Sequence, residues 1–317
     1  MTILAKVLRK THEAIDICSY ELARVDGSPL PAFTAGSHVD VQVPGGYTRQ
    51  YSLCSDAADH RRYRIAVLRD PRSRGGSAGM HDQIKEGDTV VIGEPRNHFP
   101  LVPARRTLLF AGGIGVTPLL CMARHLNATG SAFTLHYCAR SRERTAFRAE
   151  IEASRFAADV RFHFDDGAVE QKLDLQAVLA APDPGTHIYV CGPGGFIDWV
   201  TATAATLGWP GSHVHLEYFG ASPADTSADR PFQVRIASSG QLYEIPAGKT
   251  VIQVLQARGI EIPVSCEQGV CGTCITRVLE GECEHRDHYL TDEERAMNDQ
   301  FTPCCSRARS ELLVLDL

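Results

Sequence analysis

The sequence predicts a multi-domain protein with an antiparallel β-barrel, a parallel α/β domain and a compact C-terminal β-rich domain. Three observations lead to this prediction. The chain has 317 residues, more than one ordinary core accommodates. Short strand patterns fill the first hundred residues, after which strand and helix patterns alternate. Beyond about residue 230, a β-rich module carries a loop of closely spaced cysteines.

The first domain is predicted over residues 1–103. Its strand-like runs include HVDVQV (38–43), RYRIAVL (62–68) and TVVIG (89–93), which Gly, Pro and Asp separate. Closely spaced short strands favour a small antiparallel barrel. The N-terminus lacks the apolar core and cleavage site of a signal peptide, and no stretch approaches the roughly 18–20 apolar residues that span a bilayer. We therefore expect a cytoplasmic protein.

The second domain is predicted over residues 104–223, where strands and helices alternate. This rhythm is typical of a parallel sheet, because a helix is the usual connection between parallel strands. The expected strands are 107–111, 133–139, 160–164 and 187–192. The expected helices are 117–130, 143–154, 174–181 and 196–208.

A linker and a small third domain complete the chain. Residues 220–231 contain no large apolar residue, which favours an interdomain linker. The third domain, predicted over 230–317, carries 9 basic and 13 acidic residues. This acidic balance suits docking on a basic partner, or it is an ordinary solvated surface. The net charge of −6 for the whole chain argues against non-specific nucleic-acid binding.

Four of the eleven cysteines form a pattern. Cys266, Cys271 and Cys274 have the spacing C-x4-C-x2-C, and Cys304 follows after 29 intervening residues. This is the spacing of a plant-type [2Fe–2S] cluster, which needs four thiolates. Disulfides are disfavoured in the cytoplasm, so clustered cysteines there indicate a metal or catalysis.

The cysteine loop also has alternative interpretations. Gly269 and Gly272 allow the backbone to fold closely around a metal, but a zinc site also uses four thiolates. Zinc sites normally have two C-x2-C pairs, and only one is present. Cys304 and Cys305 are adjacent, so spacing alone leaves the fourth ligand open. The segment Cys283–His285 resembles half of a Rieske motif, but no C-x-x-H follows it.

A flavin site is predicted around RQYSL (49–53). Ser52 is the candidate hydrogen-bond donor near flavin N5, Tyr51 packs against the ring or ribityl chain, and Arg49 balances the phosphate charge. The segment is weak alone, because a Tyr-Ser pair in a barrel strand is usually ordinary packing. Backbone N–H groups for the same phosphate are expected from the segment Arg74–Ser77, namely from Gly75, Gly76 and Ser77.

Two glycine-rich turns predict a dinucleotide site. The first follows a buried strand and allows a pyrophosphate to approach a helix N-terminus through Gly112, Gly113 and Gly115. The second turn also ends a strand, and its candidate residues are Cys191, Gly192, Pro193 and Gly195. This interpretation places Cys191 near atom C4 of the nicotinamide. A buried strand cysteine is the alternative.

Residues that follow the second and third strands are candidates for the adenosine end. Arg140 and Ser141 suit a ribose or phosphate, although the arginines there also suit a solvated helix start. Asp165 and Asp166 can accept hydrogen bonds from ribose hydroxyls and repel a 2′-phosphate, which favours NADH. The arginines favour NADPH, so the sequence leaves the choice open.

Together these motifs resemble the phthalate dioxygenase reductase family, the class IA reductases of ring-hydroxylating oxygenases, over essentially the whole chain. The matching segments are RQYSLC, RGGS, LLFAGGIGVTP, HYCARSRERTAF, YVCGPGGF, SCEQGVCGTC and QFTPCCSRARSELLVLDL. The resemblance implies an FMN-binding barrel, an NADH domain and a plant-type ferredoxin domain of the β-grasp fold. It implies Cys304 as the fourth ligand. It also implies FMN contacts from Val67, Leu68, Arg69, Thr117 and Phe219.

The resemblance further implies a reductase component that passes electrons from NADH through FMN and a [2Fe–2S] cluster to a terminal Rieske oxygenase. The members that serve vanillate O-demethylases are the most similar. Reductases for phthalate, phenoxybenzoate or carnitine oxygenases are the alternatives within the family. Outside it, the alternative is a redox-sensing iron–sulfur flavoprotein with vestigial sites, which the intact glycine turns and four cysteines disfavour.

Overall fold

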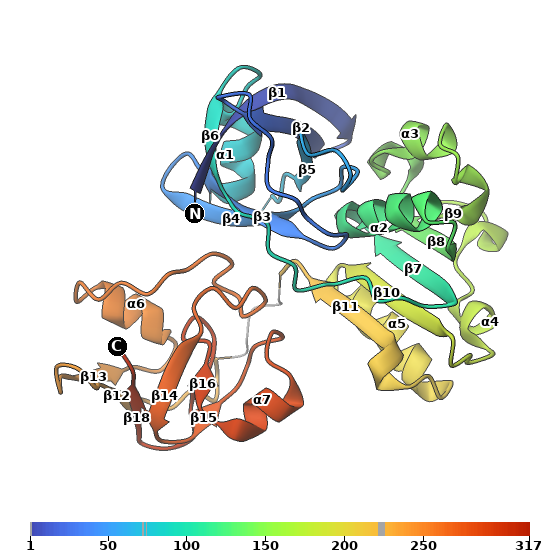
Figure 1. Ribbon diagram of the computed structural model, residues 1–317. Coiled ribbons are helices and arrows are strands. Elements are labelled where there is room, and N and C mark those ends of the chain that lie inside the picture. The colour runs from blue at the N-terminus through green and yellow to red at the C-terminus, as the bar shows by residue number, and fades with distance from the viewer. Residues whose placement is uncertain (1, 72, 74, 221–225) are drawn as a thin grey trace. The chain divides into compact units, whose positions relative to one another are not determined.

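The computed structural model describes residues 2–71, 73, 75–220 and 226–317 (Figure 1). The chain divides into two compact units, Met1–Phe219 and Gly220–Leu317. Arg74 of the predicted phosphate segment and residues 221–223 of the predicted second domain lie outside the described residues. Among the described residues, no helix combines the length and apolar character that crossing a membrane requires.

The first unit begins with a six-stranded antiparallel sheet in the order β4-β3-β6-β1-β2-β5. Its strands are β1 (Thr2–Ala14), β2 (Ile17–Arg24), β3 (His38–Val43), β4 (Tyr47–Ser52), β5 (Tyr63–Leu68) and β6 (Thr89–Gly93), and one helix, α1 (Gly76–Gln83), precedes β6. A bridge between Leu53 and Ile65 brings the ends of β4 and β5 together. The sheet therefore closes into the expected barrel, with alternate residues of β1 and β3 buried inside.

The same unit continues with a five-stranded parallel sheet in the order β11-β10-β7-β8-β9. Its strands are β7 (Arg106–Gly112), β8 (Ala132–Ala139), β9 (Val160–Phe164), β10 (Thr186–Gly192) and β11 (Val214–Tyr218). Its helices are α2 (Val116–Ala128), α3 (Arg148–Glu152), α4 (Leu175–Leu179) and α5 (Gly194–Thr206). The helices α2 and α3 cover one face of the sheet, and α4 and α5 cover the other (Figure 1). Short 3-10 turns join these elements: η1 (Gly113–Gly115), η2 (Arg142–Arg144), η3 (Ala157–Asp159), η4 (Val169–Gln171) and η5 (Gly211–His213).

The parallel sheet differs from the sequence prediction in two places. The expected helix over 143–154 is only the turn η2 followed by the short α3. Phe147 adopts a left-handed conformation with φ 60°, which interrupts a right-handed helix. The fifth strand, β11, was not predicted from the sequence. The boundary predicted at residue 103 falls between β6 and β7 inside the first unit, and it stays a prediction.

Specific contacts hold the barrel against the parallel sheet. Arg64 of β5 pairs with Glu150 of α3 at 2.7 Å. The hydroxyl of Tyr189 on β10 accepts a hydrogen bond of 2.8 Å from the N–H of Val102, in the segment that connects the two sheets. These contacts join β5 to α3 and the connecting segment to β10, so they hold the barrel and the parallel sheet together.

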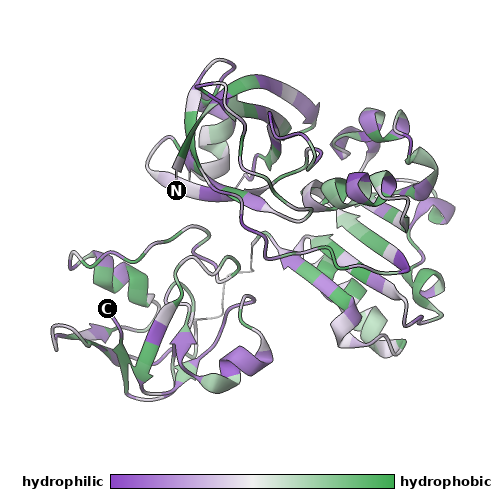
Figure 2. Ribbon diagram, in the orientation of Figure 1, coloured by the Kyte–Doolittle hydropathy of each residue, from purple (hydrophilic) through white to green (hydrophobic). Residues whose placement is uncertain are grey.

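The second unit contains a five-stranded mixed sheet in the order β13-β12-β18-β14-β16. The strands are β12 (Phe232–Ile236), β13 (Leu242–Ile245), β14 (Thr276–Glu280), β16 (Gln300–Phe301) and β18 (Leu312–Leu315), with a separate pair β15 (Cys283–Glu284) and β17 (Arg307–Ala308). The helix α6 (Val251–Gln256) packs its apolar side on this sheet. The helix α7 (Asp292–Met297) is hydrophilic throughout much of its length (Figure 2). Both helices begin with a capping box, which satisfies their first N–H groups.

Candidate functional site

Three polar side chains meet where the barrel adjoins the parallel sheet. Ser52 is the last residue of β4, and Cys191 lies one residue before the end of β10. Glu217 of β11 is directly opposite Cys191 in the strand register. The Ser52 hydroxyl donates a hydrogen bond to the Glu217 carboxylate. The structure therefore brings together the predicted flavin donor and the predicted nicotinamide cysteine, through a residue that the sequence prediction missed.

Burial controls the electrostatics of this meeting point. The carboxylate oxygen Oε2 of Glu217 is buried and has no partner among the described residues. Burial raises the pKa of Glu217 to about 8, although the hydrogen bond from Ser52 opposes this shift. Burial also raises the pKa of the Cys191 thiol, and the nearby Glu217 adds to the effect. Both groups are consequently protonated at neutral pH, so the site is neutral.

The predicted phosphate residues gather at the start of α1. A Cβ on Gly76 would lie 2.7 Å from Nε of Arg49, and a Cβ on Gly75 would collide with the Tyr47 ring. Gly75 also has φ 111°, which a larger residue rarely adopts. The Arg49 guanidinium lies 5.2 Å from the centre of the Tyr47 ring. The Arg49 cation and the N-terminus of α1 thus lie in one small region, a combination that suits a phosphate.

Two serines organise the same helix start. The hydroxyl of Ser73 accepts hydrogen bonds from the N–H groups of Gly75 (3.2 Å) and Ala78 (3.3 Å). The hydroxyl of Ser77 accepts a hydrogen bond from the Asp70 N–H at 3.1 Å. The Ser77 side chain is therefore engaged within the protein, which leaves its backbone N–H for the role we predict. Ser73 and Tyr47 were missed, because neither belongs to a recognisable motif.

The flavin contacts that the resemblance implies occupy varied positions. Val67 is buried, and its carbonyl lies 2.8 Å from Nε2 of His81. Leu68 is 37% exposed, and Arg69 forms an exposed ion pair of 2.8 Å with Asp82. The other two are Thr117, whose hydroxyl donates to the carbonyl of Ile114, and Phe219, which is 40% exposed. The roles of these five residues stay predictions.

The two glycine-rich turns pack backbone to backbone. A Cβ on Gly115 would lie 2.6 Å from the N atom of Gly192, and a Cβ on Gly192 would lie 2.9 Å from Cα of Gly112. Gly113 has a positive φ of 55°. Because parallel strands end at the same edge, β7 and β10 present both turns together at the N-termini of α2 and α5. Pro193 and Gly195 are exposed on this edge, which suits an approaching pyrophosphate.

The predicted adenosine residues lie two and three strands from Cys191. The Asp166 N–H donates to the carbonyl of Arg140 at 3.2 Å, so the ends of β8 and β9 are joined there. Arg140, Asp165 and Asp166 are exposed, and Ser141 is half-buried. These side chains are therefore available to a ligand that extends along the sheet edge.

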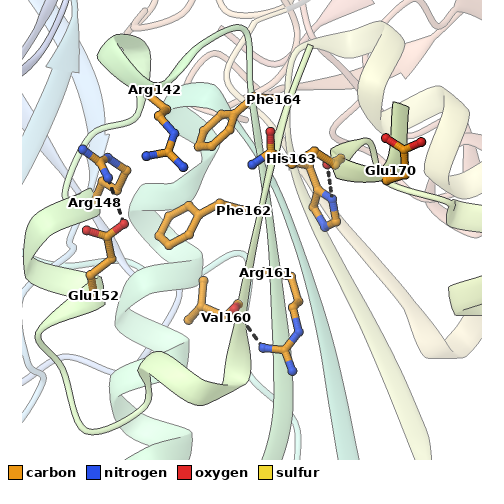
Figure 3. Close-up of a pocket in the computed structure, with 10 residues that line it drawn as sticks. Arg142, Arg148, Glu152, Val160, Arg161, Phe162, His163, Phe164 and Glu170 are labelled. Atoms are coloured by element: carbon orange, nitrogen blue, oxygen red, sulfur yellow. Dashed lines mark hydrogen bonds and ion pairs between the residues drawn. The ribbon is translucent and has the colours of Figure 1, made fainter. Parts of the chain in front are cut away.

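An open pocket of about 360 Å³ lies along the outer edge of β9 (Figure 3). Its lining includes the neighbouring rings of Phe162 and Phe164, with the Arg142 guanidinium 5.6 Å from the centre of the Phe164 ring. None of the predicted site residues lines it, although Arg142 directly follows Ser141. The pocket is thus adjacent to the adenosine residues but separate from them.

The four predicted cluster ligands come together in the second unit. The thiol of Cys266 contacts those of Cys271 and Cys304, and Cys304 also contacts Cys274. The sulfur of Cys266 accepts hydrogen bonds from the N–H groups of Gln268 (3.3 Å) and Val270 (3.4 Å). These thiols and amides hold the pKa of Cys266 far below its ordinary value, which favours a thiolate.

The geometry of the loop suits a cluster. Gly269 and Gly272 both have positive φ, and a Cβ on either would collide with the Cys305 sulfur or the Tyr289 ring. Such close packing requires glycine. Cys304 is buried, while Cys305 is half-buried and its sulfur lies 3.3 Å from Oγ1 of Thr302. Thiol contacts that link the four cysteines pair by pair, together with loop amides aimed at the sulfur of Cys266, fit a [2Fe–2S] cluster.

The barrel, the nucleotide-type sheet and the cysteine loop define an iron–sulfur oxidoreductase that is also built to bind a dinucleotide. Residues 109–202 match the model of the oxidoreductase NAD-binding domain, and residues 234–309 match that of the 2Fe-2S iron-sulfur cluster binding domain. These matches agree with the sites described above.

Similar proteins extend over the whole chain. The vanillate O-demethylase oxidoreductase of Pseudomonas sp. (strain HR199 / DSM 7063) is 56% identical over 305 residues, which cover 96% of each chain. That of Pseudomonas putida is 53% identical and covers 99% of each chain. The solved structure of a phthalate dioxygenase reductase, described as modular for electron transfer from pyridine nucleotides to [2Fe–2S], is 42% identical with a TM-score of 0.78. It covers 100% of this chain and 98% of its own.

The chain belongs to the phthalate dioxygenase reductase family of oxygenase reductases. The predicted fold class and the predicted family are confirmed.

Proposed function

We propose that this protein is the NADH-dependent reductase component of a vanillate O-demethylase, and that it passes electrons from NADH through FMN and the cluster to a terminal Rieske oxygenase. The observation that carries the proposal is the meeting of Ser52 and Cys191 around Glu217, in a chain that also holds the four-cysteine loop. This meeting supports flavin and nicotinamide sites at one edge of the first unit.

The side chains bind and orient, and the cofactors carry the redox chemistry. When bound, FMN accepts two electrons with a hydride and gives them up one at a time. Arg49 and the N–H groups of Gly76 and Ser77 hold its phosphate. When the flavin binds, Ser52 turns its single O–H from Glu217 toward the ring, and the protonated carboxyl of Glu217 then donates to the Ser52 oxygen and so orients that hydroxyl. The neutral Cys191 packs where the nicotinamide arrives, without adding charge to the hydride path.

The dinucleotide lies along the ends of β10, β7, β8 and β9 in this proposal. Its pyrophosphate approaches Gly112, Gly113 and Gly115, and its adenosine ribose approaches Asp166. The carboxylates of Asp165 and Asp166 are exposed and repel a 2′-phosphate, so we propose NADH as the donor. FMN, and not FAD, is proposed from membership of the phthalate dioxygenase reductase family, because the phosphate cradle next to Arg49 suits either flavin.

The oxygenase partner is inferred from the relatives. Those at 53–56% identity are vanillate O-demethylase oxidoreductases, whereas the phthalate dioxygenase reductase of Burkholderia cepacia is 43% identical. The vanillate system is therefore favoured over the phthalate system. Cytoplasmic location stays part of the proposal, since this is where NADH is supplied.

An anaerobic titration of the purified protein with NADH tests the electron path. We expect bleaching of the flavin absorbance, followed by the low-temperature EPR signal of a reduced [2Fe–2S] cluster. A matched variant, Cys304→Ala, should show the flavin change without the EPR signal. No absorbance change with either NADH or NADPH would contradict the proposal.

The partner is tested by reconstitution. The protein is mixed with the oxygenase component of a vanillate O-demethylase, NADH and vanillate, and demethylated product is measured. The same mixture with a phthalate oxygenase and phthalate is the control. Faster turnover with phthalate would assign the protein to a different oxygenase while leaving the electron path intact.

A further inference from the structure

The segment Cys283–His285, which does not complete a Rieske motif, leads to a buried polar group near the cysteine loop. His285 follows β15, and its side chain is only 10% exposed. Both ring nitrogens, Nδ1 and Nε2, are buried and have no hydrogen-bond partner in the described part of the chain. Buried polar atoms are almost always satisfied, so an imidazole with two unpartnered nitrogens needs an explanation.

The nearest charged group is the carboxylate of Asp287, whose side chain is completely buried. Its Oδ1 lies 3.7 Å from Nδ1 of His285. Its Oδ2 accepts hydrogen bonds from the N–H groups of Leu290 (2.8 Å) and Tyr289 (3.2 Å). These backbone donors keep the carboxylate in place, so a negative charge remains next to the imidazole.

Two contacts connect Asp287 to the cysteine ligands. A Cβ on Gly269, midway between Cys266 and Cys271, would lie 2.9 Å from Cα of Asp287. On the other side, the hydroxyl of Ser306 donates to Oδ1 of Asp287 at 3.3 Å, and Ser306 lies two residues after Cys304. Asp287 is thus packed against both segments that supply the proposed ligands, and His285 lies beside Asp287.

Charged groups surround this pair. They come from β15, β17, α7 and the segment before β12. The groups are Arg286, Arg295 and Arg307, together with Asp229, Glu284 and Asp287. The cysteine loop adds the exposed Glu267, and the segment after Cys304 adds the thiol of Cys305. The carboxylates therefore outnumber the arginines by one, and a proton on His285 balances the charges of these groups.

We propose that His285 takes up a proton when an electron reaches the cluster that the cysteine loop holds. One electron arrives from the flavin and one proton from water, and no bond between heavy atoms forms or breaks. The imidazolium offsets the added negative charge, and Asp287 stabilises it. Histidine suits this role because it is the side chain that ordinarily changes charge near neutral pH. The inference rests on the cluster that the proposed function includes.

The test is the midpoint potential of the cluster in the full-length protein with both cofactors bound, measured by EPR-monitored redox titration from roughly pH 5.5 to 8.5. We expect the potential to fall with pH by up to about 59 mV per unit, the value for one proton per electron. His285→Gln should remove most of this slope. His288→Gln is the matched control, because His288 is exposed and its backbone N–H, which the substitution keeps, donates to the carbonyl of Gly269.

A wild-type potential that does not change with pH would overturn the inference, and so would an unchanged slope in His285→Gln. If that variant loses its cluster, His285→Asn is compared in its place, and the wild-type profile still decides whether proton uptake occurs. Failure of the proposed function is distinguishable, because the wild-type protein would then show no cluster EPR signal at any potential.

Discussion

The hydroxyl of Ser52 donates a hydrogen bond to the carboxylate of Glu217, which joins the last residue of a barrel strand to the outermost strand of the parallel sheet. This contact links the two halves of the first unit at the place where the proposed cofactor sites meet. Because the carboxylate oxygen Oε2 of Glu217 is buried there, protonation of this group affects the stability of the fold.

The first prediction concerns stability and pH. The pKa of Glu217 is raised from its ordinary 4.5 to about 8, so the folded state keeps a proton that the unfolded state releases. The stabilising contribution of the protonated group is present below about pH 4.5 and is lost as pH rises to about 8. The slope is at most about 1.4 kcal/mol per pH unit. Thermal unfolding of Glu217→Gln, measured through release of the flavin, should not show this loss of stability as pH rises. Parallel curves of stability against pH for the variant and the wild-type protein would contradict the prediction.

Ser52→Ala should slow flavin reduction by NADH roughly 10- to 100-fold, because one hydrogen bond to the reacting ring is lost. NADH affinity should change little, since Ser52 is not on the predicted dinucleotide surface. Stopped-flow absorbance measures both quantities. Ser19→Ala is the control, because Ser19 is also buried in the barrel but bonds to Glu13. Equal rates in both variants would remove Ser52 from the hydride site.

Arg49→Lys should weaken FMN binding by about tenfold, because a lysine keeps the charge but loses the planar pair of donors. Equilibrium dialysis of the apoprotein with FMN measures the affinity. Arg62→Lys is the matched control, since Arg62 is an exposed barrel arginine in surface ion pairs. If FAD binds more tightly than FMN to the wild-type protein, the proposed cofactor is wrong.

Asp166→Asn should raise kcat/KM for NADPH roughly tenfold and change that for NADH much less, because a charge that repels the 2′-phosphate is removed. Steady-state reduction of an artificial acceptor measures both values. Asp159→Asn, at the other end of β9, serves as the control. An unchanged preference would show that Arg140 or another group sets nucleotide selectivity.

The adjacent cysteines should behave differently. Cys304→Ala should lose the cluster, because Cys304 contacts Cys266 and Cys274. Cys305→Ala should retain it, because the half-buried Cys305 lies beside Thr302 and Gly269. Iron content and visible absorbance separate the two outcomes. Retention of the cluster in Cys304→Ala, with loss in Cys305→Ala, would reverse the assignment.

Local patterns in the sequence were sufficient to predict much of the fold and of the candidate sites. The spacing of Cys266, Cys271 and Cys274 predicts their meeting, because a short loop can bring them together only by folding around a common centre. The glycine-rich turns at 112–115 and 192–195 follow buried strands, so their place at the sheet edge also follows from local pattern. Hydrophobic periodicity predicted the barrel and the parallel α/β sheet, because it is also a local pattern.

The tertiary structure decided the contacts between distant segments. Glu217 meets Ser52 only because closure of the barrel and the order of the parallel strands place β4 next to β11. No spacing of residues along the chain encodes how close these two strands lie. Asp287 acquires its place beside Gly269 in the same way, because the segment that follows β15 packs on the cysteine loop. A sequence motif records which ligands a short segment offers. Burial, and therefore the protonation of Glu217, depends on what the rest of the fold places around it.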